Sequence, residues 1–312
     1  MSPPDAPEAD DTACDPYVPR AEAPEVLIGP AGLETRLLDL IAQAQSTVDL
    51  LIYEFDRQSF IDALIAAQGR GVRVRVIVDP DVDDNNPTKA QLSAAGIEVK
   101  DGPGAFDYYH SKVILVDGRL AVIMSANLVW AHFEITRNYG VIDRDLEDVV
   151  DVRRIFEADF GQGGAPDLAC TRLVVSPVNA RARLLDLIDG AEQSLSLAQM
   201  SLRDDDVVAA VKRRAAAGVE VRVLLPDPGW IPESAEMAQG IAAPGVQVKQ
   251  FTRYDLHAKL ILTEKAAFVG SENMTWTSIE QNREVGVFVT EEPSLQAIAQ
   301  QFGSDWDSGV AP

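Results

Sequence analysis

Hydrophobic and polar positions follow two rhythms along this chain, and the two rhythms alternate. Apolar residues at helical spacing predict helices at about 33–45 and 58–69, and a third at about 145–160. Between them, runs rich in Val and Ile predict strands, such as those at 48–55 and 72–79. Strands that alternate with helices are typical of an α/β layer fold, in which helices cover a mixed sheet.

The same order of elements occurs twice. The segment RLLDLIAQAQSTVDLLIYEF, which starts at Arg36, resembles RLLDLIDGAEQSLSLAQMSL, which starts 147 positions later at Arg183. The later segments GVRVRVIVDP and GVEVRVLLPD keep the same offset, which indicates an internal duplication. We therefore predict a flexible acidic and Pro-rich tail over residues 1–25, and two homologous halves, 26–165 and 166–312.

A polar pair interrupts an apolar strand at the same place in both halves. The first copy, HSKVILVDG, carries His110 and Lys112, and the second, HAKLILTEK, carries His257 and Lys259. Side chains alternate along a strand, so each histidine shares a face with its lysine, where an unpaired charge is costly to bury. A single pair of this kind is more often structural, but two copies in register favour a function.

Turn signals predict which residues lie near each histidine. In the first copy, Asp117-Gly118 is a strong signal for a two-residue hairpin turn. Such a turn would place Ser125 opposite His110, with Asn127 one step further along the same face.

The second copy predicts the same cluster through a different turn. A three-residue turn centred on Glu264 would place Ser271 opposite His257, followed by Asn273 on the same face. Both halves are therefore expected to gather His, Lys, Ser and Asn at the open end of a hairpin.

This doubled pattern resembles the signature of the phospholipase D superfamily, His-x-Lys-(x)4-Asp-(x)6-Gly-Ser-x-Asn, which usually occurs twice in one chain. The first copy has Met124 in place of the motif glycine, and the second has Glu264 in place of the aspartate and one residue fewer before the glycine. The resemblance covers nearly the whole chain beyond the tail. It implies two phospholipase D-like α/β/α sandwich halves with mixed sheets, and an active site at their pseudo-two-fold interface.

The resemblance implies a phosphodiesterase that needs no metal or other cofactor. One neutral imidazole attacks phosphorus and forms a covalent phosphohistidine. The opposite imidazole, protonated, donates to the leaving oxygen, while lysines and asparagines stabilise the phosphate oxygens. The expected catalytic residues are His110, His257, Lys112, Lys259, Asp117 and Glu264, and the expected phosphate ligands are Asn127, Asn273, Ser125 and Ser271.

The resemblance also suggests how the two histidines divide the work. His110 is the expected nucleophile and His257 the expected acid, because the N-terminal histidine is often the attacking one in the family. Glu284 resembles a family glutamate that orients a catalytic histidine and fixes its tautomer, and Asn138 takes its place in the first half. For Asp117, a role in the turn alone is an equally good account.

Charge narrows the choice of substrate. The 312 residues carry a net charge of −22, so polyanions are repelled at long range. This favours a phospholipid headgroup ester or another phosphodiester as the partner, hydrolysed or transferred to an alcohol, over a nucleic acid. An endonuclease acting on DNA or RNA stays the alternative, because Arg73, Arg75, Arg137 and Arg283 could form a local basic strip. A non-catalytic binding module is disfavoured by the intact motif residues in both halves.

The sequence also predicts the places of three tryptophans and of the third histidine. The loop at 226–237 differs from its counterpart, and its Trp230 is a candidate for transient contact with a membrane surface. Trp130 and Trp276 occupy equivalent positions and are expected to pack in the core. His132 aligns with a serine and is expected at the surface or in simple packing.

The remaining features bear on redox state and location. Cys14 in the tail and Cys170 in the linker leave a disulfide and two free thiols equally open. No apolar run approaches the roughly 20 residues of a membrane-spanning helix, and the sequence as given contains no hydrophobic leader. We expect a secreted or periplasmic protein, with a cytoplasmic one as the alternative, and a monomer because one chain holds both half-sites. The three histidines and two cysteines show no metal-ligand spacing.

Overall fold

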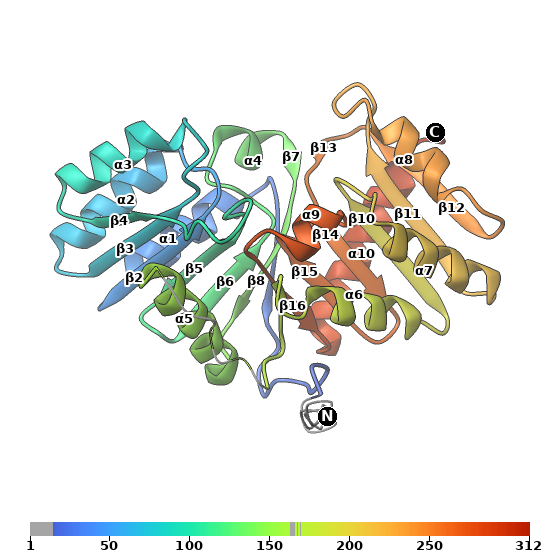
Figure 1. The fold of residues 1–312 in the computed structure, drawn as a ribbon, viewed down its shortest axis with the longest axis horizontal. Coiled ribbons are helices and arrows are strands. Elements are labelled where there is room, and N and C mark those ends of the chain that lie inside the picture. Colours follow the sequence, from blue (N-terminus) through green and yellow to red (C-terminus); the bar gives the residue numbers. More distant parts are fainter. Residues whose placement is uncertain (1–14, 163–165, 167, 169) are drawn as a thin grey trace, which may run out of the picture.

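The computed structural model describes residues 15–162, 166, 168 and 170–312, and it contains a seven-stranded mixed sheet in each half (Figure 1). The first half contains β1 (Glu25–Ile28), α1 (Leu33–Gln43), β2 (Thr47–Ile52), α2 (Gln58–Gly69), β3 (Arg73–Val78), α3 (Asn85–Ala94), β4 (Glu98–Asp101), β5 (Lys112–Val116), β6 (Leu120–Met124), α4 (Trp130–Glu134), β7 (Thr136–Arg137), β8 (Tyr139–Asp143) and α5 (Leu146–Phe160). The second half contains β9 (Leu173–Ser176), α6 (Ala180–Asp189), β10 (Ser194–Gln199), α7 (Asp205–Ala216), β11 (Glu220–Pro226), α8 (Ser234–Ile241), β12 (Val246–Phe251), β13 (Asp255–Leu256), β14 (Lys259–Thr263), β15 (Ala267–Gly270), α9 (Trp276–Glu280), β16 (Glu284–Val289) and α10 (Glu292–Ser308).

The two sheets have the same strand order. The first runs β1-β8-β6-β5-β2-β3-β4, and the second, β9-β16-β15-β14-β10-β11-β12, repeats it strand for strand. In each sheet three neighbouring strands are parallel and the remaining pairs are antiparallel. The predicted α/β class with two mixed-sheet halves is confirmed. The edge strands β1 and β9 were not predicted, because four residues are too few to show a period.

Helices cover the outer face of each sheet, and the inner faces of the two sheets share one core (Figure 1). The helix α1 illustrates the cause, since Leu33, Leu37, Leu40 and Ile41 fall on one side and are buried. The shared core contains residues of both sheets and of the helices α5 and α10. The halves therefore fold around a common apolar layer, and a site at their junction is held by both.

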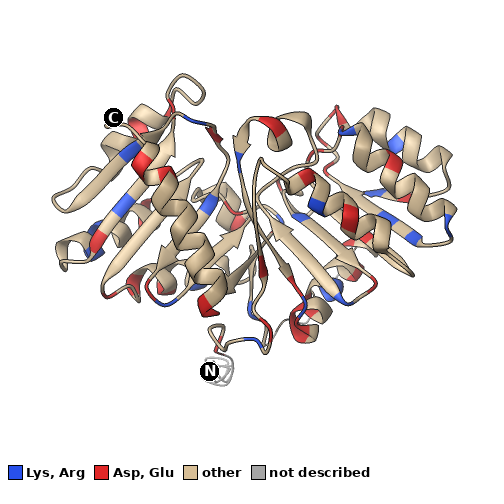
Figure 2. Cartoon of the chain, turned by 180° about the vertical axis from the view of Figure 1, so that it is seen from behind, with Lys and Arg blue, Asp and Glu red and all other residues tan. Residues whose placement is uncertain are grey.

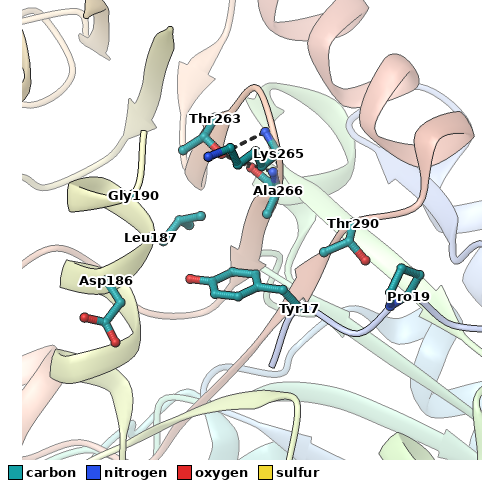
Figure 3. Close-up of a pocket in the computed structure, with 9 residues that line it drawn as sticks. All are labelled: Tyr17, Pro19, Asp186, Leu187, Gly190, Thr263, Lys265, Ala266 and Thr290. Atoms are coloured by element: carbon teal, nitrogen blue, oxygen red, sulfur yellow. Dashed lines mark hydrogen bonds between the residues drawn. The ribbon is translucent and has the colours of Figure 1, made fainter. Parts of the chain in front are cut away.

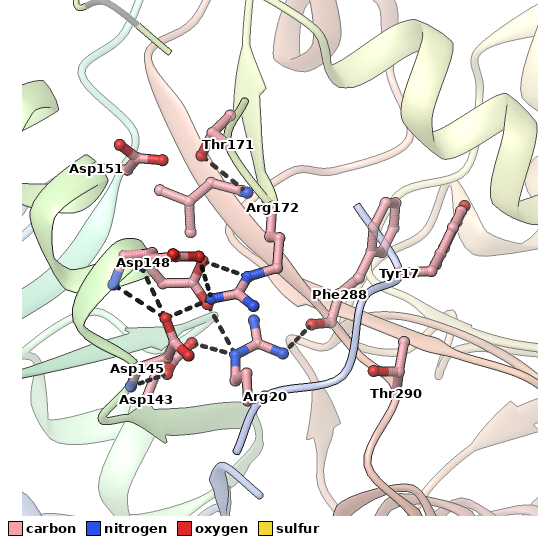
Figure 4. Close-up of polar contacts among 12 residues, drawn as sticks. Tyr17, Arg20, Asp143, Asp145, Asp148, Asp151, Thr171, Arg172, Phe288 and Thr290 are labelled. Atoms are coloured by element: carbon pink, nitrogen blue, oxygen red, sulfur yellow. Dashed lines mark hydrogen bonds and ion pairs between the residues drawn. The ribbon is translucent and has the colours of Figure 1, made fainter. Parts of the chain in front are cut away.

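The segment 15–24 is not the loose tail that its composition suggested. Arg20 is only 6% exposed, and its Nε lies 2.8 Å from carboxylate oxygens of both Asp143 and Asp148 in the first half (Figure 4). Its Nη1 donates to the carbonyl of Phe288 in the second half at 3.0 Å. Tyr17 stacks on the Phe288 ring with centroids 4.9 Å apart. Sequence alone hides this contact, because the partners of Arg20 lie more than a hundred positions away.

The first hairpin turns one residue later than predicted. Val116 pairs with Leu120 rather than with Arg119. Asp117 and Gly118 both adopt left-handed conformations, with φ of 55° and 61°, and a third residue completes the turn. The turn signal was correct, but the turn length was wrong.

The second hairpin shows the same one-residue shift. Leu262 pairs with Ala267, so its turn has four residues rather than three. Neither Ser125 nor Ser271 therefore lies directly opposite its histidine in the ladder, and a one-residue shift moves side chains to the other face. The motif residues are instead brought together where the two halves meet.

Two earlier expectations concern the chain as a whole. Within the described residues, none of the helices combines the length and the apolar character needed to cross a membrane. Cys14 lies outside the described residues, so the pairing of Cys14 with Cys170 stays an open expectation.

Candidate active site

Each motif histidine is fixed by a main-chain contact with the opposite half. The N–H of His110 donates to the carbonyl of Arg283 at 2.9 Å, and the N–H of His257 donates to the carbonyl of Arg137 at 3.0 Å. Around the second contact β13 pairs with β7 in a small parallel sheet, and around the first Tyr109 forms a bridge to Arg283. Both histidines therefore belong to one site that neither half could build alone.

The ring of His110 is oriented by a carboxylate from the second half. Its Nδ1 lies 2.7 Å from Oε2 of Glu284, which is fully buried and also accepts hydrogen bonds from Ser278 and Asn282. Burial alone would raise the pKa of Glu284, but His110 and its other neighbours hold that pKa below its usual range. Because a carboxylate only accepts, Nδ1 of His110 carries the proton and Nε2 is left with a free lone pair.

The ring of His257 is oriented by an amide from the first half. Its Nδ1 lies 3.0 Å from Oδ1 of Asn138. That oxygen also accepts from the Ser125 hydroxyl at 2.9 Å, while the Asn138 amide nitrogen donates to Thr136 Oγ1 at 2.6 Å. The amide oxygen is thus an acceptor, so the tautomer matches that of the other histidine but its partner carries no charge.

Two buried lysines accompany the histidines. Lys112 donates to the carbonyl of His110 at 2.6 Å, and its Nζ lies 4.9 Å from the centre of the Tyr53 ring. The Nζ of Lys259 lies 3.2 and 3.3 Å from the ring nitrogens of His257. Burial lowers the pKa of Lys112 to about 7, lowers that of His110 to about 4, and lowers those of Lys259 and His257 well below their usual values. Four groups that can each carry a positive charge are thus gathered in a dry place, and an anionic ligand would favour their charged forms.

The two motif asparagines keep hydrogen-bonding capacity for a ligand. Asn127 is 3% exposed, and its amide nitrogen lies 3.3 Å from Oε2 of Glu54. Among the described residues, the side-chain oxygens of Asn127 and Asn273 are buried without a partner. Buried polar atoms are normally paired. Because an amide oxygen only accepts, a donor group, and not a phosphate oxygen, would complete these two atoms.

Comparison with known proteins agrees with this geometry. A family model described as the PLD-like domain of cardiolipin synthase matches residues 37–160 and 184–306, once in each half. The chain belongs to the phospholipase D family. Its two motif copies are therefore those of one phospholipase D-type site.

Individual relatives of this phospholipase D-family chain are distant. Cardiolipin synthase from Alkalihalophilus pseudofirmus is 25% identical over 296 residues, which cover 78% of this chain and 57% of the relative. Mitochondrial cardiolipin hydrolase from Homo sapiens is 32% identical over 152 residues, 46% of this chain and 58% of the relative. The chain thus spans less than two thirds of the length of these curated relatives. The solved phosphatidylserine synthase of Haemophilus influenzae Rd KW20 shares the fold, with a TM-score of 0.71 at 13% identity over 92% of this chain and 86% of that one.

Asp117 and Glu264 lie at strand ends away from the motif lysines, which corrects the expectation that they are catalytic. Both follow the far ends of β5 and β14, away from the lysines that begin these strands. The Asp117 carboxylate accepts from the backbone N–H groups of residues 45–47 at 2.6 to 3.1 Å, and Glu264 accepts from those of residues 192–194 at 3.0 to 3.3 Å. In this phospholipase D-family chain, the motif acid anchors the start of the neighbouring strand.

The motif serines also brace the fold rather than face a ligand. The Ser125 hydroxyl donates to Asn138 and accepts from the N–H of Tyr139, at 2.9 and 3.1 Å. The Ser271 hydroxyl accepts from the N–H of Val285 at 3.1 Å. Both serines are at most 1% exposed. Instead of the expected role as phosphate ligands, Ser125 holds Asn138 and the start of β8, and Ser271 holds β16, which carries Glu284.

Packing explains why the first motif lacks its glycine. In the second half Glu272 is fully buried, and its Oε2 lies 2.5 Å and 2.8 Å from where a Cβ would sit on Gly270 and Gly286. In the first half Ala126 replaces Glu272 and leaves space that the Met124 side chain fills. Burial raises the pKa of Glu272 well above its usual value. Sequence reasoning missed it, although an ionisable residue inside the motif was a signal.

Other residues lie where the sequence did not place them. Trp130 and Trp276 are 54% and 57% exposed rather than in the core, and Trp230 is half-buried. His132 is buried, and its ring centroid lies 4.2 Å from that of His257. Trp130, His132 and Trp276 lie in α4 and α9, which have five residues each, too few for periodicity to show which side is buried.

The predicted basic strip does not form. All four arginines are paired with carboxylates, as Arg137 with Asp305, Arg283 with Asp159, Arg75 with Asp49 and Glu157, and Arg73 with Glu98. Figure 2 shows basic residues spread singly among acidic ones over both halves. These four arginines therefore offer no free basic strip to a nucleic-acid backbone.

A cavity of about 450 Å³ lies under the segment 15–24, apart from the histidines (Figure 3). Tyr17, Leu187, Thr263 and Lys265 are among the residues that line it. Thr263 is the last residue of β14, whereas the motif lysine begins that strand, so the cavity is not part of the site. Across the described ranges, no three His, Cys, Asp or Glu side chains form a group that could hold a metal ion.

Replacing Asp117 with alanine should destabilise the protein without weakening its anion site. Loss of the acceptor for three backbone N–H groups should lower the free energy of unfolding by about 2 kcal/mol, measured by urea unfolding. Hydrogen bonds to residues 45–47 lower the pKa of Asp117 although its partial burial opposes this. The stability difference should therefore be full above pH 3.8, the usual pKa of the group, and disappear below it. The matched control is Asp62→Ala on the exposed side of α2, which should change stability by less than about 0.5 kcal/mol; an equal loss in both variants would contradict the anchoring role.

Binding of an anion should make the site take up protons. The pKa values of Lys112 and His110 are lowered to about 7 and about 4 chiefly by burial, and a bound anion favours the charged forms and raises both. At pH 7.5, calorimetric titration with tungstate in buffers of different ionisation enthalpy should reveal net proton uptake. Lys112→Met should lose most of that uptake. Binding with no proton uptake would contradict the lowered pKa of Lys112.

Proposed function

We propose that this chain is a phospholipase D-type phosphodiesterase that acts on phospholipid headgroup esters. One observation carries the proposal. Two imidazoles share a site in which each Nδ1 is bonded to an acceptor of the opposite half, so Nε2 is the nitrogen left for chemistry, with Lys259 Nζ 3.2 Å from that of His257. Two buried lysines beside them supply the positive charge that a phosphodiester requires.

The chemistry follows from these surroundings in two steps. In the first, the bound anionic substrate favours the charged form of His257, which takes up a proton. Nε2 of His110 then attacks phosphorus, the P–N bond forms, and the P–O bond to the leaving group breaks as His257 gives that proton to the leaving oxygen. In the second, neutral His257 removes a proton from water, which attacks phosphorus and breaks the P–N bond. An alcohol in place of water would give transfer instead of hydrolysis, and both outcomes are compatible with the same residues.

The unequal partners of the histidines support this assignment of roles. The ring of His110 becomes positively charged when it is phosphorylated, and the carboxylate of Glu284 at Nδ1 stabilises that charge. The partner of His257 is the neutral Asn138 amide, which stabilises an imidazolium less, so His257 releases its proton more readily. Lys112 and Lys259 hold the non-bridging oxygens in both steps.

Several observations support a phospholipid rather than a nucleic acid. The net charge is −22, and the arginines that might have followed a nucleic-acid backbone are paired with carboxylates. The names of the relatives, cardiolipin synthase and cardiolipin hydrolase, point to phospholipid chemistry. The exposed Trp130 and Trp276 follow the motif asparagines by three residues, and tryptophan favours the interface between lipid and water. Parallel assays on phosphatidylcholine micelles and single-stranded DNA test the choice, since turnover of DNA alone would favour an endonuclease.

The two histidine variants should fail at different steps. On phosphatidylcholine, His110→Ala and His257→Ala should each lower kcat by roughly 10³-fold, as general acid–base and nucleophilic roles require. On a p-nitrophenyl phosphodiester, whose leaving group needs no proton, His257→Ala should still release a stoichiometric burst of nitrophenolate, and His110→Ala should release none. A burst from His110→Ala would reverse the roles. Wild-type activity should survive EDTA, and its abolition would refute the mechanism.

The exposed tryptophans should matter only for lipid at a surface. The double variant Trp130→Ala/Trp276→Ala should lower activity on phosphatidylcholine vesicles about tenfold, through loss of interfacial contact. Activity on the soluble aryl diester should stay at the wild-type level. Leu146→Ala is the matched control, because Leu146 is 62% exposed but does not adjoin the motif. A loss of equal size on soluble substrate would mean that the tryptophans serve the fold and not a lipid surface.

A further inference from the structure

His132 breaks the symmetry of the duplicated site. It lies in α4, where α9 of the second half has Ser278. Ser278 donates to Glu284, which in turn orients His110. In the second half, this position therefore supports His110, which is the histidine of the first half.

In the first half the equivalent residue, His132, contacts the histidine of the second half, His257, directly. The ring of His132 packs on the ring of His257, with centroids 4.2 Å apart and an angle of 38° between the planes. The N–H of Asn127 donates to Nδ1 of His132 at 2.6 Å, which fixes this ring and places its proton on Nε2. The backbone carbonyl of His132 accepts from the Asn138 amide at 3.4 Å, so the same residue also supports the acceptor of His257.

We propose that His132 is a positioning residue that fixes the imidazole of His257 and keeps water away from it. The inference rests on the proposed function, because it gives His257 the part of the acid in that reaction. His132 itself neither gains nor loses a proton in either step. Its uncharged ring occupies the space beside His257 in which a carboxylate or a water molecule would otherwise stabilise the imidazolium.

The groups that face His257 explain the direction of the effect. They are Lys259, two residues further along the chain, Asn138 and His132 from the first half, and Lys112 and His110 across the site. Burial is the main cause that lowers the pKa of His257, followed by Lys259 and then by the other groups. Removal of the His132 ring admits water, so the pKa of His257 should rise toward 6.5. Loss of a favourable ring face acts in the opposite sense, but burial has the larger influence.

The test separates the ring of His132 from its hydrogen bond. The chain contains three histidines, so NMR titration of the imidazole carbons can follow each one without any substrate. His132→Ser introduces the residue of the second half, and His132→Asn keeps an acceptor for the Asn127 N–H but removes the ring. In both variants the midpoint of His257 should move upward toward 6.5, and kcat on phosphatidylcholine should fall about tenfold with KM little changed. His132→Phe keeps a ring against His257, and its midpoint should stay at the wild-type value.

Ser278→Ala is the control in the other half. It removes a donor to Glu284, so it should move the midpoint of His110 and leave that of His257 in place. An unchanged His257 midpoint in both His132→Ser and His132→Asn would overturn the proposal and reduce His132 to packing. So would an upward shift in His132→Phe equal to that in His132→Asn. Because these readouts need no turnover, they remain decisive even if the wild-type protein hydrolyses no phosphodiester, a result that would refute the proposed function instead.

Discussion

The site depends on main-chain hydrogen bonds that each half gives to the histidine of the other. The carbonyl of Arg283 holds the N–H of His110, and the carbonyl of Arg137 holds the N–H of His257. The side chains of the same two arginines form buried ion pairs with aspartates at the ends of α5 and α10. Separation of the halves would break both pairs and expose the apolar core that the halves share, which is costly. Assembly of the halves and formation of the site are therefore one event.

Duplication supplies two equal imidazoles, and a few substitutions make them unequal. Glu284 faces His110 as a charged acceptor, whereas Asn138 faces His257 as a neutral one. A nucleophile gains from a partner that stabilises the charge it acquires, and an acid gains from a partner that does not. The difference between one carboxylate and one amide thus suffices to divide the two roles, while the lysines stay common to both.

The sequence identified the halves, the motif and most strands, because a repeated offset and apolar periodicity do not depend on distant contacts. It failed where a residue is defined by its neighbours in space. Asp117 belongs to the motif, yet its partners are backbone groups at the start of β2. Arg20 sits in an apparently loose tail, yet it is buried between the halves. His132 aligns with a serine in the repeat, so alignment pointed to a minor role and only the fold brings it to His257.

The central claim is that one phosphorus atom is held between imidazoles of the two halves and attacked by the first. The most direct measurement is the trapping of the intermediate in His257→Ala with a p-nitrophenyl phosphodiester, followed by its structure and by peptide mapping. The account predicts a phosphoryl group on Nε2 of His110, with Nδ1 still bonded to Glu284. A phosphoryl group on any other residue, or a slow turnover that passes through no covalent adduct, would contradict it.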